Sequence, residues 1–414
     1  MELLETKLVN DYNDIPARAV RIKHANGSLI TPAYAVNAAK TGLLAREDTA
    51  IGGIIEVSLA FRPNQLERMS RDVTLQQRFE YRVNSYTRRA RTYGKLVVAI
   101  PLVEEAREPS FSKNEAIRYG TYIAELTANP GIDIVCTPVF NRIAEKNIPL
   151  LVESFLEAMT AYDVGVVLSI PYTSRETREK LVELYLNKIS KNNRLLLSFT
   201  CADYNASNPI SKYAFHNYVL RYTKSLEEDI IGEPVAVYGV NVKYDRVSRK
   251  YDKLPARDIA AYFARLDILG GNHKRKPMPR EVVERLRAKE PPVRRIKLLD
   301  RSQYIYLDLD KAIQSEQGIP RIEPIKRIIK ENPRTLPRHV EREVERINTS
   351  NILAETIILQ RLFSGQGYQA FKDPSHYLGS KEIMRIDDKL LKALKGFNRI
   401  LGLGTKKLDK YLSP

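Results

Sequence analysis

The chain has few of the residues that build disulfide-held or metal-held folds. Its 414 residues include two cysteines, five histidines and no tryptophan. Two cysteines cannot build a disulfide framework, and no C-x-x-C pair is present to seed a structural zinc site. The histidines form no H-x-x-x-H pair, and no G-x-S-x-G nucleophile elbow occurs. We therefore expect neither a metal site nor a cofactor.

Long apolar segments are also missing. No apolar run approaches the roughly 20 residues that a membrane span needs. The N-terminus, MELLETKLVN, is acidic and lacks the basic-then-apolar order of a signal peptide. A composition of 43% hydrophobic and 28% charged residues excludes a collagenous or fully disordered chain. These features predict a soluble, cytoplasmic protein with no membrane partner.

Acidic residues are outnumbered, with 50 Asp and Glu against 67 Lys and Arg, which gives a formal charge of +17. Basic side chains neutralise phosphates and aromatic faces stack bases, so a polyanionic partner is expected. The alternative is a set of solvated helix faces in a charge-rich protein. The surplus concentrates in residues 78–95, where tyrosines are interleaved, and in residues 270–301. The basic residues assigned to nucleic acid are Arg88, Arg89, Arg91, Lys274, Arg275 and Lys276.

Short apolar runs alternate with longer helical segments about eight times between residues 20 and 275. Continuous apolar runs bounded by Gly, Pro, Asn and Asp indicate strands buried on both faces, and their alternation with helices implies a parallel sheet. Eight units over ~250 residues is the size of a (β/α)8 TIM-type barrel. An open doubly wound sheet is disfavoured, because no G-x-G-x-x-G or P-loop is present. The predicted strands are Ala19–Ile22 or Leu29–Tyr34, Gly53–Leu59, Lys95–Leu102, Ile132–Phe140, Val164–Pro171, Arg194–Thr200, Pro234–Val242 and Leu266–Gly270.

The segments between these strands have apolar residues at helical spacing. After about residue 275 the chain becomes basic and rich in proline, which indicates a change of organisation. We therefore predict a barrel over residues 1–300 and a basic, mainly helical extension over residues 301–414. The predicted helices are Asn114–Leu126, Pro149–Ala161, Ser174–Ile189, Ser211–Leu226, Ala256–Leu266, Val340–Phe363 and Lys389–Leu401, with an extra strand at Gln303–Leu309.

Active sites of such barrels lie at the C-terminal ends of the strands. Asp203 and Asp245 are the best-placed carboxylates for a nucleophile or a general base, and Glu104 could assist. Asp267 lies within a buried strand, so it needs a partner, whether for function or for structure. Taken alone, each such residue is more often a cap, a turn residue or a solvated side chain than a catalyst. Other polar residues at or beyond predicted strand ends include Asn37, Glu56, Asn141, Tyr172, Lys243 and Tyr244.

The most distinctive loop is GGNHK, at residues 270–274. Its two glycines allow close backbone approach, and their amides can face an anion. A histidine and a lysine then add a titratable group and a positive charge. This pattern favours a phosphate near the loop, with a tight turn as the alternative. The residues assigned to substrate binding are Gly270, Gly271, Asn272, His273 and Tyr204.

Three segments resemble the tRNA-guanine transglycosylases. Asn26–Gly42 (NGSLITPAYAVNAAKTG) resembles the start of that family, with its glycine turn, Thr-Pro pair and short apolar strand. Leu254–Lys276 is similar to the family's final helix–strand unit, and Ile347–Phe363 to its C-terminal helix. The resemblance spans most of the chain in order. It implies a (β/α)8 enzyme that exchanges a guanine for a 7-deazaguanine base in tRNA or, in some branches, in DNA.

The chain departs from this family at three points. The Asp-Ser-Gly-Gly-Phe-Gln signature, which carries the base-recognising aspartate, is absent, and so is the Cys/His zinc cluster. In the family, the nucleophile follows the first aspartate of the final strand by three residues. Aligning that aspartate with Asp267 puts Gly270 at the nucleophile position. The resemblance therefore implies a divergent, zinc-free branch without a matched nucleophile.

Three functions stay open at this point. The first is a glycosyltransferase (pentosyltransferase) that exchanges a base in nucleic acid, with a deazapurine as small-molecule substrate. Asp267 or Asp203 would be its carboxylate, assisted by Glu104 or Asp245. The second is a non-catalytic nucleic-acid-binding barrel, and the third is a barrel enzyme that acts on a phosphorylated small molecule. The sequence leaves open a homodimer as the assembly.

Overall fold

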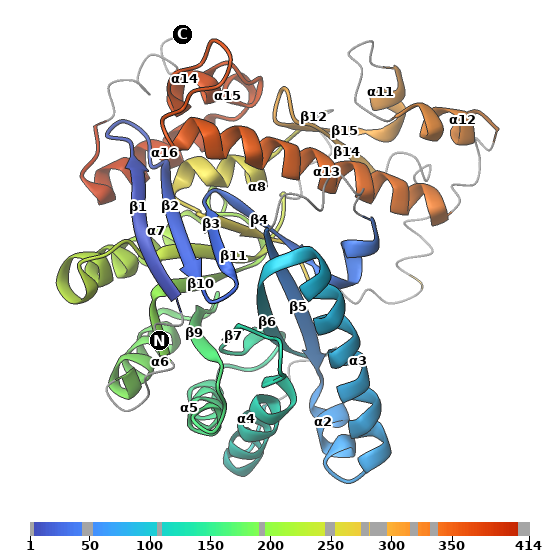
Figure 1. Ribbon diagram of the computed structural model, residues 1–414, viewed down its shortest axis with the longest axis vertical. Coiled ribbons are helices and arrows are strands. Elements are labelled where there is room, and N and C mark those ends of the chain that lie inside the picture. The colour runs from blue at the N-terminus through green and yellow to red at the C-terminus, as the bar shows by residue number, and fades with distance from the viewer. Residues whose placement is uncertain are drawn as a thin grey trace.

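Eight parallel strands close into a barrel with helices between them, which confirms the predicted (β/α)8 fold (Figure 1). The barrel is seen in a computed structural model. A mainly helical C-terminal part follows it. The structure describes residues 4–43, 53–105, 110–189, 195–244, 253–274, 281, 296–314, 322–331 and 338–404.

The barrel strands follow one another around the sheet in chain order, and the last pairs in parallel with the first. Their Val- and Ile-rich sequences are buried almost throughout, as parallel strands covered on both faces must be. β8 (Val139–Asn141) prolongs the fourth strand and also pairs with the third. The eight strands are β4 (Ala33–Asn37), β5 (Gly53–Phe61), β6 (Gly94–Glu104), β7 (Ile134–Cys136), β9 (Gly165–Ile170), β10 (Leu195–Ser207), β11 (Ala236–Val242) and β13 (Ile268–Gly270).

Helices form the outer layer, and the predicted ones are present with shifted ends. α4 begins with a complete capping box, in which the Ser112 hydroxyl and the Glu115 carboxylate each accept from the other's backbone amide. The segment predicted as one helix before the last strand is two short turns, α8 (Arg257–Ala260) and η3 (Ala261–Ala264). The other helices of this layer are η1 (Ala38–Leu43), α2 (Pro63–Met69), α3 (Val73–Tyr93), α4 (Lys113–Thr127), α5 (Ile148–Met159), α6 (Arg175–Ile189), α7 (Tyr213–Ser225) and η2 (Leu226–Ile231).

The first barrel strand is β4, which overlaps only the last two residues of the predicted run Leu29–Tyr34. The alternative run, Ala19–Ile22, forms no barrel strand. That run belongs to β2 (Arg18–His24), which pairs antiparallel with β1 (Leu4–Asp11) and β3 (Gly27–Ile30). One face of this small sheet is as apolar as a barrel strand, because its side chains Val20, Ile22 and Leu29 share a core with the barrel interior. The sheet lies at the N-terminal ends of the strands, where Thr6 Oγ1 donates to the Pro234 carbonyl over 2.6 Å.

Apolar residues fill the barrel itself and the space between its strands and helices. The barrel interior includes both cysteines, Cys136 and Cys201, whose sulfurs lie 3.2 Å apart. The interior is thus packed, as in other barrels of this size, and polar chemistry is confined to the strand ends.

The C-terminal part begins with a small antiparallel sheet of β12 (Lys253–Pro255), β15 (Ile305–Asp308) and β14 (Lys297–Asp300). The predicted boundary at residue 300 stays a prediction. β12 comes from the connection between β11 and β13.

No helix among the described residues is both long and apolar enough to cross a bilayer. The remaining helices are α11 (Leu309–Gln314), α12 (Glu323–Glu331), α13 (Arg338–Phe363), α14 (Pro374–Gly379), α15 (Ile383–Ile386) and α16 (Asp388–Leu401).

Candidate active site at the barrel mouth

The C-terminal ends of the barrel strands, here called the mouth, carry a connected set of polar side chains. They come from β5, β10 and β11 and from the segment that follows β13. All but the histidine are at least nine-tenths buried, although every one is polar or charged. Such groups require partners, and here they partner one another. This set, the mouth network, consists of Glu56, Asp203, Tyr238, Asn241, His273 and Lys274.

The Glu56 carboxylate belongs to a residue of the mouth network with none of its surface exposed. Its Oε1 accepts a hydrogen bond from the Tyr238 hydroxyl, and its Oε2 lies 2.6 Å from His273 Nε2. Burial, together with the negative charge of Glu56, raises the pKa of Tyr238 well above its usual range. The phenol therefore keeps its proton and acts as a donor, which leaves Glu56 as the acceptor.

Because Gly270 has no side chain, the Glu56 carboxylate can occupy the space beside it. A Cβ at position 270 would lie 2.3 Å from Glu56 Oε1 and 2.7 Å from the carbonyl oxygen of Gly239. Real Cβ atoms do not come so close to backbone. Position 271 is less confined, because its nearest neighbour would be Glu56 Oε2 at 3.8 Å. The absence of a side chain at position 270 is thus matched by a carboxylate that reaches the same space from β5.

The ring of His273 is held in one tautomer by its neighbours. The Asn37 side-chain oxygen accepts from the Ala39 amide at 2.8 Å, so the Asn37 amide nitrogen faces the ring. That nitrogen lies 3.0 Å from His273 Nδ1, which must therefore accept. The ring proton then resides on Nε2 and is donated to Glu56. The His273 ring thus covers one oxygen of the buried carboxylate.

An ion pair closes the other side of the mouth. Lys274 Nζ donates to Asp203 Oδ2 and to the Phe140 carbonyl, each over 2.6 Å, and lies 3.4 Å from Asn205 Oδ1. An ammonium group has three protons, so these three acceptors use all of them. The side chains of Lys274 and Asp203 are 3% and 1% exposed, and the pair is therefore sealed from water.

Asn241 joins the Glu56–His273 contact to the Lys274–Asp203 ion pair. Its Oδ1 accepts from the His273 backbone amide at 2.9 Å, while its Nδ2 donates to Asp203 Oδ1 at 2.9 Å. Asn241 adopts a left-handed backbone conformation, with φ at 56°, as does Asn205, with φ at 51°. Among non-glycine residues, asparagine enters this region most readily. The left-handed backbone conformation at these two neighbouring strand ends orients the side-chain amides of Asn205 and Asn241 toward the mouth.

Comparison with known proteins adds no family to this geometry. No protein-family model matches the chain, and no curated protein matches it in sequence. Among the described residues, no group of three or more His, Cys, Asp or Glu side chains could hold a metal ion. The arrangement of the mouth must therefore be interpreted from its own chemistry.

The structure brings together five of the residues assigned to the site from the sequence. Gly270, Gly271 and His273 lie beside Glu56, and Lys274 pairs with Asp203, which is the fifth of these residues. Asn272 bonds within its own turn, to the Lys274 backbone. Asp245, Arg275 and Lys276 lie outside the described residues.

Asp267 lies at the other end of the barrel. It precedes β13, and its two carboxylate oxygens accept from Arg18 Nε at 3.1 Å and Nη2 at 2.8 Å. It also accepts from the Val237 amide at 2.8 Å. Glu227 completes a buried group with Arg18, at 2.6 Å. These contacts tie β2 to the barrel, so the partner that a buried aspartate requires is Arg18.

Glu104 and Tyr204 are also separate from the mouth network. Glu104 ends β6, where its nearest charged partner is Arg62 at 3.8 Å. Tyr204 points into the core between strands and helices, where its hydroxyl lies 2.6 Å from His216 Nδ1. The alternation of side chains along β10 explains the difference, because Asp203 and its neighbour Tyr204 must face opposite sides of the barrel wall.

The arginines assigned to nucleic acid on α3 do not lie at the mouth. They occupy its last two turns, next to the start of β6, and thus the N-terminal ends of the strands. Arg91 is paired with Asp133 at 2.6 Å, and that carboxylate also accepts from the Val97 amide. Arg88 and Arg89 are exposed.

Three members of the mouth network had no role in the sequence interpretation. Glu56 was named only as a polar residue near a strand end, and Tyr238 and Asn241 were not considered. Glu56 did carry a signal, since it interrupts the apolar run GIIEVSL, and a charge inside a buried strand needs a partner. No feature of the surrounding sequence distinguishes Tyr238 or Asn241 from ordinary strand residues.

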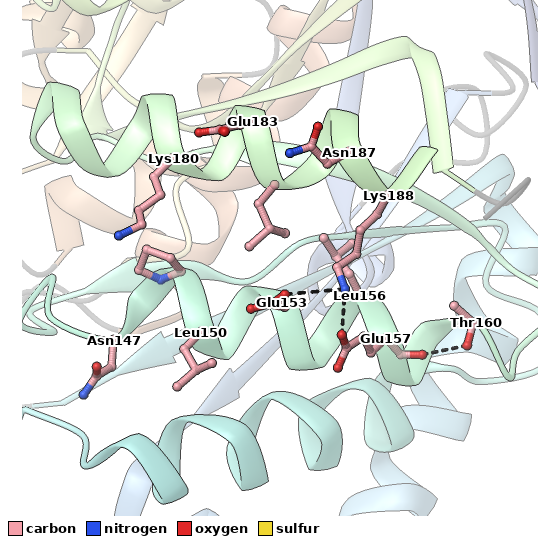
Figure 2. A pocket seen from close by; sticks show the side chains of 12 residues that line it. Asn147, Leu150, Glu153, Leu156, Glu157, Thr160, Lys180, Glu183, Asn187 and Lys188 are labelled. Atoms are coloured by element: carbon pink, nitrogen blue, oxygen red, sulfur yellow. Dashed lines mark hydrogen bonds and ion pairs between the residues drawn. The ribbon is translucent and has the colours of Figure 1, made fainter. Parts of the chain in front are cut away.

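A groove lies elsewhere, between α5 and α6 of the outer layer, with a volume of about 920 Å³ (Figure 2). Lys188 reaches across it from α6 to Glu153 and Glu157 of α5, at 3.6 and 2.7 Å. Leu150, Leu156 and Leu184 also line it. The barrel wall separates this groove from the mouth network, so the two are distinct.

Proposed function

We propose that the chain exchanges a purine base in nucleic acid, with Glu56 as the nucleophilic carboxylate. The resemblance to tRNA-guanine transglycosylases suggests the reaction: a guanine leaves and a 7-deazaguanine base enters. The observation that carries the proposal is the carboxylate of Glu56 in the space above Gly270. The resemblance assigns a nucleophile to position 270, and β5 supplies a carboxylate at that place instead.

The proposed reaction has two displacements. Glu56 Oε2 bonds to the sugar anomeric carbon, the glycosidic bond breaks, and its electron pair leaves with the old base, which takes a proton from water. The incoming base then loses its proton to water and attacks the same carbon, and the carboxylate leaves. Covalent catalysis of this kind divides one difficult displacement into two easier ones.

His273 and Tyr238 act in this proposal as positioning residues. Both donate to Glu56 and fix its orientation. The imidazole covers Oε2, so the sugar reaches this oxygen after the ring has turned away. A base inside a duplex would have to be extruded or presented single-stranded before it could enter a site at this depth.

Release of labelled guanine from tRNA and from DNA, with a 7-deazaguanine base in the medium, tests the proposal. We expect the wild type to release guanine and Glu56→Gln to release none. Glu104→Gln is the matched control, because it removes another buried strand-end carboxylate that lies outside the mouth network. A sugar adduct on Glu56, detected by mass spectrometry without incoming base, would identify the nucleophile. Equal activity of wild type and Glu56→Gln would contradict this role.

A non-catalytic nucleic-acid-binding barrel is the second candidate. This candidate is favoured because every carboxylate oxygen of Glu56 and Asp203 already accepts a hydrogen bond within the protein. If oligonucleotides bind but no base is released, this candidate replaces the first. The third function, on a phosphorylated small molecule, loses its support. Lys274 has no proton left for a phosphate, and the anion near the glycines is Glu56.

A further inference from the structure

A shallow depression of about 300 Å³ lies between α2 and α3, on the outside of the barrel. Three arginines rim it, with Arg68 on α2 and Arg78 and Arg82 one turn apart on α3. All three side chains are exposed. The residues that complete its lining are Gln65, Met69, Leu75 and Phe79.

These arginines have no carboxylate partner among the residues that the structure describes. The Arg82 guanidinium lies over the Phe79 ring, 4.9 Å from its centroid, and this contact leaves its N–H groups free to donate. The nearest acidic residue of α2, Glu67, is already bound by Arg71 and by Arg118. Three exposed arginines around one depression therefore form a cationic surface, and guanidinium forks of this kind donate to carboxylate or phosphate oxygens.

An exposed tyrosine extends this surface. Tyr81 precedes Arg82 on α3 and is 72% exposed, the largest value among the exposed large hydrophobic side chains that the structure describes. An aromatic ring left in water beside guanidinium groups is typical of surfaces on which a nucleobase stacks while the phosphates are neutralised. Phosphate chemistry and stacking together indicate nucleic acid more than a small anion or an acidic peptide.

The depression lies on the mouth side of the molecule. β5 continues for five residues beyond Glu56, to Phe61, and α2 begins at Pro63. At ~3.3 Å per residue, the start of α2 is about 20 Å from Glu56 along the strand direction. α2 lies beside the first half of α3 (Figure 1). This half of α3 carries Arg78 and Arg82. A strand bound here could continue toward the mouth.

We propose that the surface formed by Arg68, Arg78, Tyr81 and Arg82 binds the phosphate backbone of the nucleic-acid substrate, an inference that rests on the function proposed above. Arginine forks donate to phosphate oxygens, and Tyr81 stacks one unpaired base. The arginines assigned from the sequence, Arg88, Arg89 and Arg91, lie farther along α3, at its end away from the mouth.

Fluorescence anisotropy with a labelled single-stranded DNA oligonucleotide, and separately with tRNA, tests this surface at several salt concentrations. Each lost phosphate contact reduces the slope of log affinity against log salt by about 0.9 for duplex DNA and 0.7 for single strands. We expect Arg78→Ala/Arg82→Ala to weaken binding about tenfold or more and to lower this slope by between 1 and 2. The control, Arg221→Ala/Arg385→Ala, removes the same charge from exposed arginines of α7 and α15 and should match the wild type.

The outcomes separate this surface from the reaction at the mouth. If both double variants bind as the wild type does while Glu56-dependent exchange persists, the surface proposal is wrong and the proposed function stands. If the α3 variant alone loses affinity and no exchange occurs, the surface stands and the proposed reaction fails. A wild type that binds neither oligonucleotide nor tRNA overturns both. Displacement of the oligonucleotide by inorganic phosphate at constant ionic strength would show a small-anion site and overturn the surface proposal.

Discussion

The carboxylate of Glu56 lies where the side chain of residue 270 would be if that residue were not glycine, with 2.3 Å between Oε1 and an ideal Cβ. The two residues come from strands on either side of β4, and 214 positions separate them in the sequence. Small-to-large changes in well-packed sites cost about 1–3 kcal/mol, because neighbours must move. We expect Gly270→Ala to lower the free energy of unfolding by this amount or more.

The contrast with the next residue makes the prediction specific. Gly271→Ala would place its Cβ 3.8 Å from Glu56 Oε2, an ordinary contact, so it should leave stability nearly unchanged. Urea unfolding of both variants measures the difference. Combining Glu56→Ala with Gly270→Ala should recover part of the loss, because the clash with Oε1 is then removed. Equal stability of the two glycine variants would contradict the crowding at position 270.

The second prediction concerns the buried pair of Lys274 and Asp203. Removing one partner of such a pair leaves an uncompensated charge and costs about 3–5 kcal/mol. We expect this loss for Lys274→Met. Lys23→Met is the control, since Lys23 pairs with Glu5 at 3.2 Å on an exposed surface, where a pair contributes about 0–1 kcal/mol. Similar unfolding free energies for the two variants would show that the mouth pair is open to water.

The third prediction is a pH dependence that originates at His216. Burial between Tyr204 and the Ala264 carbonyl lowers the pKa of His216 to about 4. The folded protein thus favours the neutral ring. Its contribution to stability is complete above the unfolded pKa of about 6.5 and is lost progressively as the pH falls from there toward 4.

Comparison of the wild type with His216→Gln isolates this contribution from that of the carboxylates. The difference in their unfolding free energies should shrink by roughly 3 kcal/mol between pH 7.5 and pH 4. Denaturant unfolding at several pH values measures it. A difference that does not change with pH would mean that His216 takes up its proton equally well in the folded state.

The barrel could be predicted because its signal is local. Runs such as Gly53–Phe61 and Ala236–Val242 are apolar on both faces, and only a covered parallel sheet buries such runs. The first strand was less clear, since Val20 and Ile22 are just as buried in the small N-terminal sheet as a barrel strand would be. Local burial identifies a strand but does not identify the sheet to which it belongs.

The mouth network could be predicted only in part. The loop after β13 was found because strand ends carry the chemistry of these barrels. The partner of His273, however, lies 217 residues away, and the link through Asn241 depends on a left-handed backbone that no sequence signal announces. Asp267 was recognised correctly as needing a partner, but the sequence could not show that this partner is Arg18 at the opposite end.

The last prediction tests whether Asp267, at the N-terminal end of the barrel, has a role in the reaction proposed for the mouth. Asp267→Asn keeps the size of the side chain but removes the charge that pairs with Arg18 through two hydrogen bonds. Both side chains are 1% exposed, so the loss should destabilise the fold by about 3–5 kcal/mol. Because Asp267 lies at the N-terminal end of β13, the rate of the proposed base exchange per folded molecule should stay within about twofold of the wild type. A tenfold loss of rate would correspond to about 1.36 kcal/mol of barrier. Exchange assays on protein whose folded fraction is known from circular dichroism measure this ratio. A stable Asp267→Asn protein without activity would return the catalytic role to Asp267 and remove it from Glu56.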